Sequence, residues 1–301
     1  MNLLARLLFV WIAICSINLA HGGPSDGTGP VGYVEQLAGN LDSFSIERAG
    51  RTLSPALLLP VQTGDRLSVR GRGNILSLQC GNRRIRVTEL ESPFVVPPNA
   101  TPPGFLSRLG VLLLDVGGRL TTQQAKSVTK VATSSRGHDE PLAIPLLQGR
   151  TSHLALPDKT LYVAWAGGSP PYEVRVTSVK SESRQIAALG GIEDQRAIVA
   201  LSHSLPIGFA QVEIIDHDGS TARGLFEVIP AKRLPTAEAA LNDTDVPASL
   251  KQILWMDALL KDSPAEWSFQ AYQVISPLVP ESQPAQALRD CLERTVSCYD
   301  R

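Results

Sequence analysis

The sequence has no marked excess of charge, few aromatic residues and only four cysteines. Its formal net charge is −1, and no cluster of basic and aromatic residues is present, which argues against a nucleic-acid partner. Beyond the N-terminus no apolar run is long enough to cross a membrane, because polar residues and Pro206 interrupt the best candidate, Ala197–Ile215. Hydrophobic residues still make up 43% of the chain, so it can bury substantial cores. We therefore expect a folded protein with no integral membrane segment in its mature form.

Sequence motifs of common enzymes are lacking as well. There is no H-E-x-x-H or C-x-x-C metal motif, no phosphate-binding loop and no Ser-Asp-His grouping. His138, His153 and His203 each stand without a second ligand at helical or hairpin spacing, so we expect none of them to hold a metal ion. The sequence thus predicts a protein that is not an enzyme and binds no cofactor, with a hydrolase of unfamiliar site as the alternative.

One glycine-rich stretch, AWAGGSPPYEVRV at Ala164–Val176, places a serine between two apolar runs. A nucleophilic serine of this kind is followed by a helix, and a phosphate loop opens a helix and carries a lysine. Here two prolines and an alternating, strand-like run follow, so we interpret the stretch as a loop that joins two strands. Loops at the ends of sheets often carry binding residues. The candidate interaction loop consists of Gly167, Gly168, Ser169 and Tyr172.

The N-terminus has the pattern of a secretory signal peptide. Residues 1–22 contain a short start with one positive charge, then the apolar run Leu7–Ala20, which is shorter than the roughly 20 residues that span a bilayer. Small residues allow cleavage after Ala20 or after Gly22, and retention as a membrane anchor is the alternative. We expect an exported protein of the periplasm.

Export removes Cys15 and leaves three cysteines in an oxidising compartment. Cys291 and Cys298 are the expected disulfide. In one continuous helix they would lie roughly 10 Å apart, whereas a disulfide needs Cα atoms within about 7 Å. The bridge therefore requires the helix to end near Thr295. Cys80 lies in a strand-like run and is expected to be a buried small hydrophobic residue.

Residues 31–96 read as a small β domain of short strands separated by turn residues. Its most recognisable features are Gly32-x-Val34, Gly39, Glu47-Arg48-x-Gly50, Leu57–Leu59, Gly64-Asp65-x-Leu67, Leu76, Leu78 and Gly81. These features resemble the periplasmic FecR family, although Cys80-Gly81 stands where that family usually has Asp-Gly. The resemblance implies a β-rich, noncatalytic envelope module of the kind used in signalling and in scaffold-like exported proteins.

Residues 97–140 are expected to be a Pro-rich linker with a short helix. Apolar residues at helical spacing predict that helix over Phe105–Leu120, ended by Gly117-Gly118. The polar residues Thr121–Glu140 then continue the linker.

Residues 141–231 carry about seven strand signals with turns at regular spacing, which is typical of a β-sandwich. The expected strands are Leu142–Leu147, Ser152–Leu156, Thr160–Trp165, Tyr172–Val179, Arg196–Leu201, Gln211–Ile215 and Gly224–Ile229. Residues 181–194 fit either a helical turn or a longer crossover. The GGSPPY-plus-strand pattern also resembles bacterial immunoglobulin-like domains, which implies an immunoglobulin-like β-sandwich.

The stretch IIDHDGST contains the spacing of a calcium loop. Asp216, Asp218 and Ser220 fall at positions one, three and five of such a loop, and Glu227 falls at position twelve. However, the glycine is misplaced and strands flank the loop where helices are required. Asp-Gly between two β runs favours a hairpin turn, so the hairpin is the expected structure and the calcium loop the alternative.

Residues 236–301 form an expected α-helical C-terminal region. The helical segments are Thr236–Leu241, Ala248–Leu260, Ala265–Ile275 and Gln283–Val296. The predicted fold class is therefore mainly β, with a FecR-like β domain, an immunoglobulin-like β-sandwich and a short helical region. The expected function is a noncatalytic, exported protein-interaction or scaffolding protein that binds another envelope protein or peptidoglycan. A periplasmic regulator in a transmembrane signalling system is the alternative.

Overall fold

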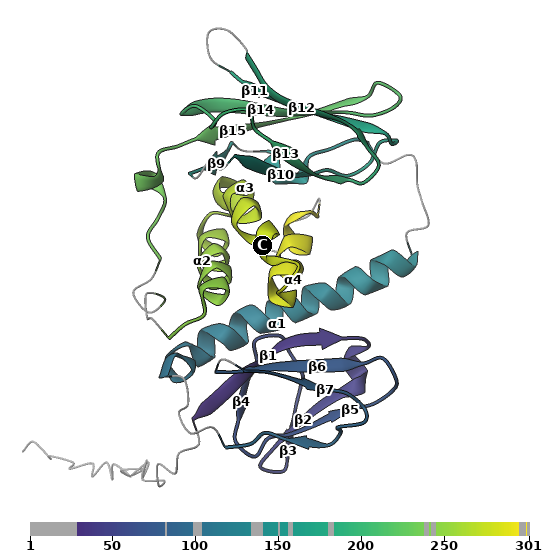
Figure 1. Ribbon diagram of the computed structural model, residues 1–301, viewed down its shortest axis with the longest axis vertical. Coiled ribbons are helices and arrows are strands. Elements are labelled where there is room, and N and C mark those ends of the chain that lie inside the picture. The colour runs from purple at the N-terminus through teal and green to yellow at the C-terminus, as the bar shows by residue number, and fades with distance from the viewer. Residues whose placement is uncertain are drawn as a thin grey trace, which may run out of the picture.

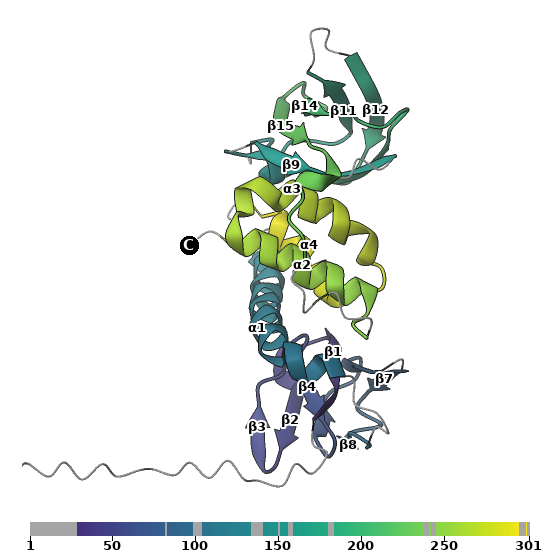
Figure 2. The same ribbon diagram turned by 90° about the vertical axis from the view of Figure 1, so that its left-hand side faces the viewer.

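A computed structural model describes residues 29–81, 83–98, 104–133, 141–149, 151–155, 159–179, 184–237, 241, 245–294 and 299. These residues form fifteen strands in four sheets and a C-terminal helical region, which confirms the expected mainly β fold class (Figure 1). The C-terminal helices lie between an N-terminal β unit and a β-sandwich, and this order is also seen after a 90° turn (Figure 2). Within the described residues, no helix combines the length and apolar character needed to cross a membrane.

The N-terminal unit consists of two four-stranded sheets, ordered β4-β1-β6-β7 and β3-β2-β5-β8. Its strands are β1 (Pro30–Ala38), β2 (Phe44–Arg48), β3 (Arg51–Leu53), β4 (Pro60–Gln62), β5 (Arg66–Val69), β6 (Ile75–Cys80), β7 (Arg83–Val87) and β8 (Phe94–Val95). Two sequence features singled out above meet here, because Arg48 donates two hydrogen bonds, of 2.9 and 2.7 Å, to the buried carboxylate of Asp65. The second Asp65 oxygen also accepts from the backbone N–H of Gln62 at 2.8 Å, so this carboxylate fixes the turn between β4 and β5.

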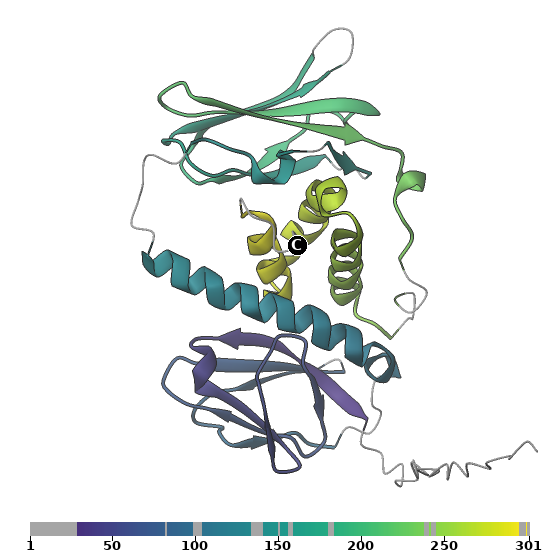
Figure 3. The same cartoon turned by 180° about the vertical axis from the view of Figure 1, so that it is seen from behind.

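Helix α1 (Gly104–Thr133) lies against the N-terminal unit, and Figure 3 shows its length from behind. The expectation of a short helix ended by Gly117-Gly118, with polar linker from Thr121, is wrong. Gly117 lies inside the helix. A residue without a Cβ is needed there, because a Cβ at this position would overlap the carbonyl oxygen of Leu57. The Leu57 N–H donates to Thr121 Oγ1 at 2.8 Å, so the glycine permits close docking of a loop onto the helix.

The sandwich packs a two-stranded sheet, β10-β13, with a five-stranded sheet, β12-β11-β14-β15-β9. Its strands are β9 (Ser152–Leu154), β10 (Thr160–Ala164), β11 (Tyr172–Ser178), β12 (Arg184–Ile192), β13 (Arg196–Ala200), β14 (Gly208–Ile215) and β15 (Thr221–Val228). Alternate residues of β11 and β15 are buried, as their apolar alternation predicts. The undecided stretch 181–194 contains β12, whose two register shifts against β11 bend this edge strand.

One expected strand of the sandwich is absent. Leu142–Leu147 instead holds a 3-10 turn at Pro145–Leu147, preceded by a single bridge between Ala143 and Ala166. Pro145 lacks the N–H that a strand ladder requires. Leu146 and Leu147 are buried all the same, so their apolar character reflects core packing and not strand pairing.

The C-terminal region contains α2 (Ala248–Asp262), α3 (Pro264–Ile275) and α4 (Gln283–Leu292). The expected helix Thr236–Leu241 is not formed at Thr236 and Ala237, and residues 238–240 lie outside the described residues. Pro264 begins α3, a position at which its missing N–H costs no hydrogen bond. Helix α3 packs on β9 and β10, whereas α4 packs on α1 and β1.

Two glutamine side chains connect this helical region to both β units. In the sandwich, Gln273 Oε1 accepts from the Tyr162 N–H at 2.8 Å and its Nε2 donates to the Tyr162 carbonyl at 2.8 Å. In the N-terminal unit, Gln283 Oε1 accepts from the Leu37 N–H at 2.6 Å and its Nε2 donates to the Leu37 carbonyl at 2.9 Å. Each side-chain amide therefore forms hydrogen bonds with both the backbone N–H and the carbonyl of one strand residue, as a neighbouring strand would.

Candidate interaction site

A hollow of about 570 Å³ opens where the sandwich meets the C-terminal helices. It is lined by Trp165 and Ala166 after β10, by residues 193–195 between β12 and β13, by Arg196 at the start of β13, and by Glu293 after α4. The two strand ends are brought together by the pairing of β10 with β13, in which Ala164 lies opposite Arg196. The hollow is therefore built by the sandwich topology and closed on one side by the helical region.

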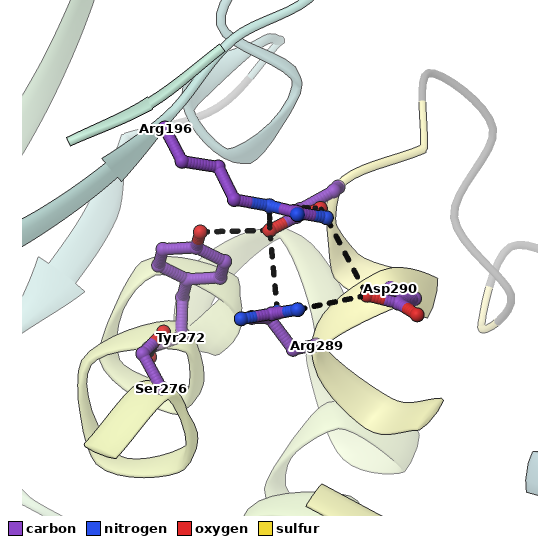
Figure 4. A network of polar contacts seen from close by, with 6 residues as sticks. Arg196, Tyr272, Ser276, Arg289 and Asp290 are labelled. Carbon is purple, nitrogen blue, oxygen red and sulfur yellow. Dashed lines mark hydrogen bonds and ion pairs between the residues drawn. The ribbon is translucent and has the colours of Figure 1, made fainter. Parts of the chain in front are cut away.

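The wall between sandwich and helices is a polar network in which Arg196, Tyr272 and Arg289 converge (Figure 4), and Glu293 is the carboxylate that they share. Arg196 donates to both Glu293 oxygens, from Nε at 2.9 Å and from Nη2 at 2.5 Å, and Tyr272 Oη donates to Oε1 at 2.8 Å. Arg289 Nε lies 3.6 Å from the same carboxylate. Asp290 lies 3.4 Å from Arg289 and 3.6 Å from Arg196.

The electrostatics of this network favour a structural role. Burial, with the nearby Glu293 charge, raises the pKa of Tyr272, so its hydroxyl remains a donor. The hydrogen bond to Glu293 is the largest effect on Arg196 and raises its pKa. Burial raises the pKa of Asp290. A charged guanidinium and a protonated phenol thus hold one carboxylate in place, which fixes Arg196 of the sandwich to α4.

The mouth of the hollow is acidic. Glu193 and Asp194 are exposed and have no hydrogen-bond or ion-pair partner within the described part of the chain. Gln195 is also exposed and donates to the Gly167 carbonyl at 3.2 Å, and Trp165 contributes a buried side chain to the lining. Such an arrangement can hold a cationic group, such as an amine or guanidinium, against carboxylates.

The expected interaction loop adjoins this hollow but differs from the prediction in one respect. The loop joins β10 to β11, as expected, and Gly167 and Gly168 adopt φ angles of 73° and 71°. Tyr172 is buried, however, and its hydroxyl donates to the carbonyls of Gly167 and Gly168 at 3.1 and 3.0 Å. Tyr172 therefore anchors the loop from inside and is not available to a partner, while Ser169 is partly exposed.

The four residues of the calcium-loop alternative are not brought together. Asp216 is buried and accepts from the backbone of Ser220 at 2.7 Å and of Ser169 at 3.4 Å. Glu227 lies at the other end of the β14–β15 hairpin, opposite Phe209, whereas Asp216 and Asp218 belong to the turn. Asp216 thus uses its oxygens to fix the hairpin against the Gly167–Ser169 loop. Across the described residues, no group of three His, Cys, Asp or Glu side chains could hold a metal ion.

The expected disulfide is only partly visible. Cys291 is buried and disulfide-bonded, and α4 ends at Leu292, early enough for the chain to turn back. Cys298 lies outside the described residues, so the pairing of Cys291 with Cys298 stays a prediction. Cys80 is a free, buried thiol.

His153 was expected to be isolated, yet it lies between two carboxylates. Its Nδ1 is 3.3 Å from Glu227 Oε2, and its Nε2 is 3.1 Å from Glu266 Oε1. Glu227 and Glu266 are 74 and 113 residues further along the chain, a separation at which sequence spacing carries no signal. Within the described residues, the His203 ring has a hydrogen bond with Ser202 Oγ alone, at 3.4 Å, as expected of an ordinary turn histidine. His138 lies outside the described residues.

No protein-family model matches the chain, and no curated protein matches it. Among solved structures, the chain is similar to CopC from Methylosinus trichosporium OB3b. The match has 19% identity, covers 29% of this chain and 91% of that chain, and has a TM-score of 0.21. A likeness at this level carries no argument about function.

Proposed function

We propose that the chain is a noncatalytic, exported protein of the bacterial envelope that scaffolds or binds a partner through a rigidly held surface. The observation that carries the proposal is the pair of glutamine amides, Gln273 and Gln283, through which one helical region holds both β units. A fixed separation of the two β units suits a scaffold, which presents its binding surfaces in a constant arrangement.

Further contacts support rigidity. Arg119 of α1 donates two hydrogen bonds, of 2.7 and 2.8 Å, to Asp257 of α2, and Phe226 of the sandwich packs on Phe269 of α3 with ring centroids 4.8 Å apart. Units joined only by a small polar interface move relative to one another by default. Here one continuous apolar cluster contains buried residues of the N-terminal unit, α1, the helical region and the sandwich.

Sequence patterns support the envelope location, and the hollow beside the loop supports the kind of partner. The signal-peptide pattern at residues 1–22 favours export to the periplasm, and the FecR resemblance of residues 31–96 favours an envelope module. The middle unit is proposed to be immunoglobulin-like, a fold in which loops at the sandwich ends bind partners. The acidic hollow beside Gly167–Ser169 lies at one such end, and it suits a partner that presents an amine or guanidinium.

Two kinds of partner fit that chemistry: an envelope protein with a basic side chain, and peptidoglycan with the free amines of its stem peptides. The proposal favours the envelope protein, because the hollow lies on a frame in which one helical region holds two β units. A periplasmic regulator of a transmembrane signalling system is a special case in which the bound protein is a signalling component.

The experiment places a photo-crosslinking amino acid at position 194, and in a matched control at Asp42 of the N-terminal unit, which is also exposed and acidic. We expect a discrete protein adduct from position 194 in intact envelopes, which is lost when Glu193→Gln is added. Co-sedimentation with purified peptidoglycan, abolished by the same substitution, would instead identify the polymer as the partner. Equal adducts from both positions, or hydrolysis of envelope polymers by the purified chain, would contradict the proposal.

A further inference from the structure

Strand β12 forms one border of the five-stranded sheet of the sandwich, with β11 as its neighbour (Figure 2). An edge strand presents unpaired backbone N–H and C=O groups on its free side, and natural proteins usually shield them with charged residues or proline. From Gln185 to Ile192 this strand has neither a charged residue nor a proline. Residues 188–191 are exposed, and the apolar side chain of Leu189 is among them. The border is therefore open to a further strand.

Elsewhere in the molecule, side-chain amides close open positions of strands. Gln273 does so on β10 and Gln283 does so on β1. On β12, within the described residues, one side chain bonds to the backbone, because Ser202 Oγ donates to the Ile186 carbonyl at 2.8 Å. The part of β12 that follows Ile186 has no such cap among the described side chains.

Two register shifts against β11 limit where an added strand can pair with β12. They lie between Gln185 and Ala187 and between Leu189 and Ile192. Bulges of this kind bend a strand and protect its edge. Between the two shifts, Ala187–Leu189 keep a regular register with β11. An added strand is therefore expected to centre on Ala188.

The two ends of β12 carry opposite charges. Arg184 at its start is exposed, and Glu193 and Asp194, which directly follow its end, are exposed as well. In the part of the chain that the structure describes, none of these three side chains has a hydrogen bond or an ion pair. Opposite charges that face each other across paired strands are favourable, whereas like charges are not. A strand that is basic at one end and acidic at the other is therefore complementary to an antiparallel copy of itself.

We propose that two copies of the chain associate through their β12 strands, antiparallel and about a twofold axis at Ala188. In this arrangement Arg184 lies opposite Ile192 of the second copy, and Glu193 of that copy is the next residue along the strand. A strand rises only about 3.3 Å per residue, so the long arginine side chain reaches the carboxylates of Glu193 and Asp194. The interface therefore has an ion-pair cluster at each end and a short strand pairing between them.

This inference rests on the proposed function, because it names the basic group that the acidic mouth of the hollow receives. That group is the guanidinium of Arg184 of a second copy, so the bound envelope protein is the chain itself. The regular stretch of β12 is short, and a single exposed ion pair contributes little. We therefore expect a weak dimer that depends on the charges at both ends and that dissociates at high salt, where those charges are screened.

The test is sedimentation velocity of the full chain over a series of protein concentrations. The wild type should show a monomer–dimer equilibrium. Arg184→Glu and Glu193→Arg should each raise the dimer dissociation constant by about a hundredfold, because each variant sets like charges together at both ends of the interface. An equimolar mixture of the two variants should dimerise again, since opposite charges then meet at both ends. This recovery also shows that both variants are folded.

Arg72→Glu is the matched control, because Arg72 is an exposed arginine in a turn of the N-terminal unit. It should dimerise as the wild type does. A wild type that is monomeric at every concentration, a dimer that both charge reversals leave unchanged, or a mixture that stays monomeric would overturn the inference. The proposed function would still stand if the photo-crosslinker at position 194 gave a discrete adduct with a different protein. Equal adducts from position 194 and its control position would instead contradict the proposed function.

Discussion

Two adjacent glycines of α1 should respond in opposite ways to the same substitution. A Cβ at Gly117 would overlap the backbone carbonyl of Leu57, and side-chain rotation cannot relieve a clash with backbone. A Cβ at Gly118 would have no neighbouring atom within 4 Å. We therefore expect Gly117→Ala to destabilise the protein and Gly118→Ala to stabilise it.

The magnitudes follow from three terms. Alanine gains about 1 kcal/mol over glycine inside a helix, and this gain applies to both variants. At Gly117, forced separation of the loop from α1 costs about 1–3 kcal/mol in packing. It also stretches the hydrogen bond from the buried Leu57 N–H to Thr121, and leaving that donor unpaired costs about 1–3 kcal/mol. The net expectation is a loss of about 1–5 kcal/mol for Gly117→Ala and a gain of up to about 1 kcal/mol for Gly118→Ala.

The assay is urea unfolding of the wild type and both variants, in which midpoints are compared once equal slopes have been verified. Gly118→Ala controls for helix propensity, because it makes the same chemical change one residue away on the exposed side of the helix. Equal midpoints for the two variants would refute the close docking of Leu57 onto α1.

Three further outcomes are expected. Gln283→Leu should cost about 2 kcal/mol, because it leaves the buried Leu37 N–H and carbonyl unpaired, and amide exchange at Leu37 should accelerate while the exposed control Gln286→Leu leaves it unchanged. Burial raises the pKa of Cys80, so a thiol reagent at pH 8 should label it only upon unfolding; rapid labelling of the folded protein would contradict its burial. The hydrogen bond from Lys261 is the main cause that lowers the pKa of Asp115. The stabilisation from Asp115 is therefore present at neutral pH and lost as the pH falls through the lowered value, and Asp115→Asn should flatten the acid limb of a stability–pH curve.

Most strands could be predicted from local pattern. Alternation in Tyr172–Ser178 and the Asp-Gly turn after Ile215 are signals carried within ten residues, and the structure has β11 and the β14–β15 hairpin there. The C-terminal helices could also be predicted from local signals, since Pro264 at a helix start and the proline-rich breaks mark their boundaries.

The errors arose where distant contacts decide the structure. Gly117 reads as a helix end, but its role is to admit the Leu57 carbonyl from 60 residues earlier. Tyr172 reads as a loop residue that could meet a partner, but it turns inward to bond the Gly167 and Gly168 carbonyls. The Glu293 network and the carboxylates around His153 join three separate elements each, so no spacing in the sequence reveals them.

The central claim is that the helical region holds the two β units at one separation. It is tested most directly by a spin-label distance measurement between Leu90→Cys in the N-terminal unit and Asp218→Cys in the sandwich, both exposed positions. The buried Cys80 and the disulfide-bonded Cys291 leave the introduced cysteines as the reactive ones among the described residues. We expect a single narrow distance distribution that broadens in the Gln273→Leu, Gln283→Leu double variant. A broad distribution in the otherwise wild-type chain would contradict the claim.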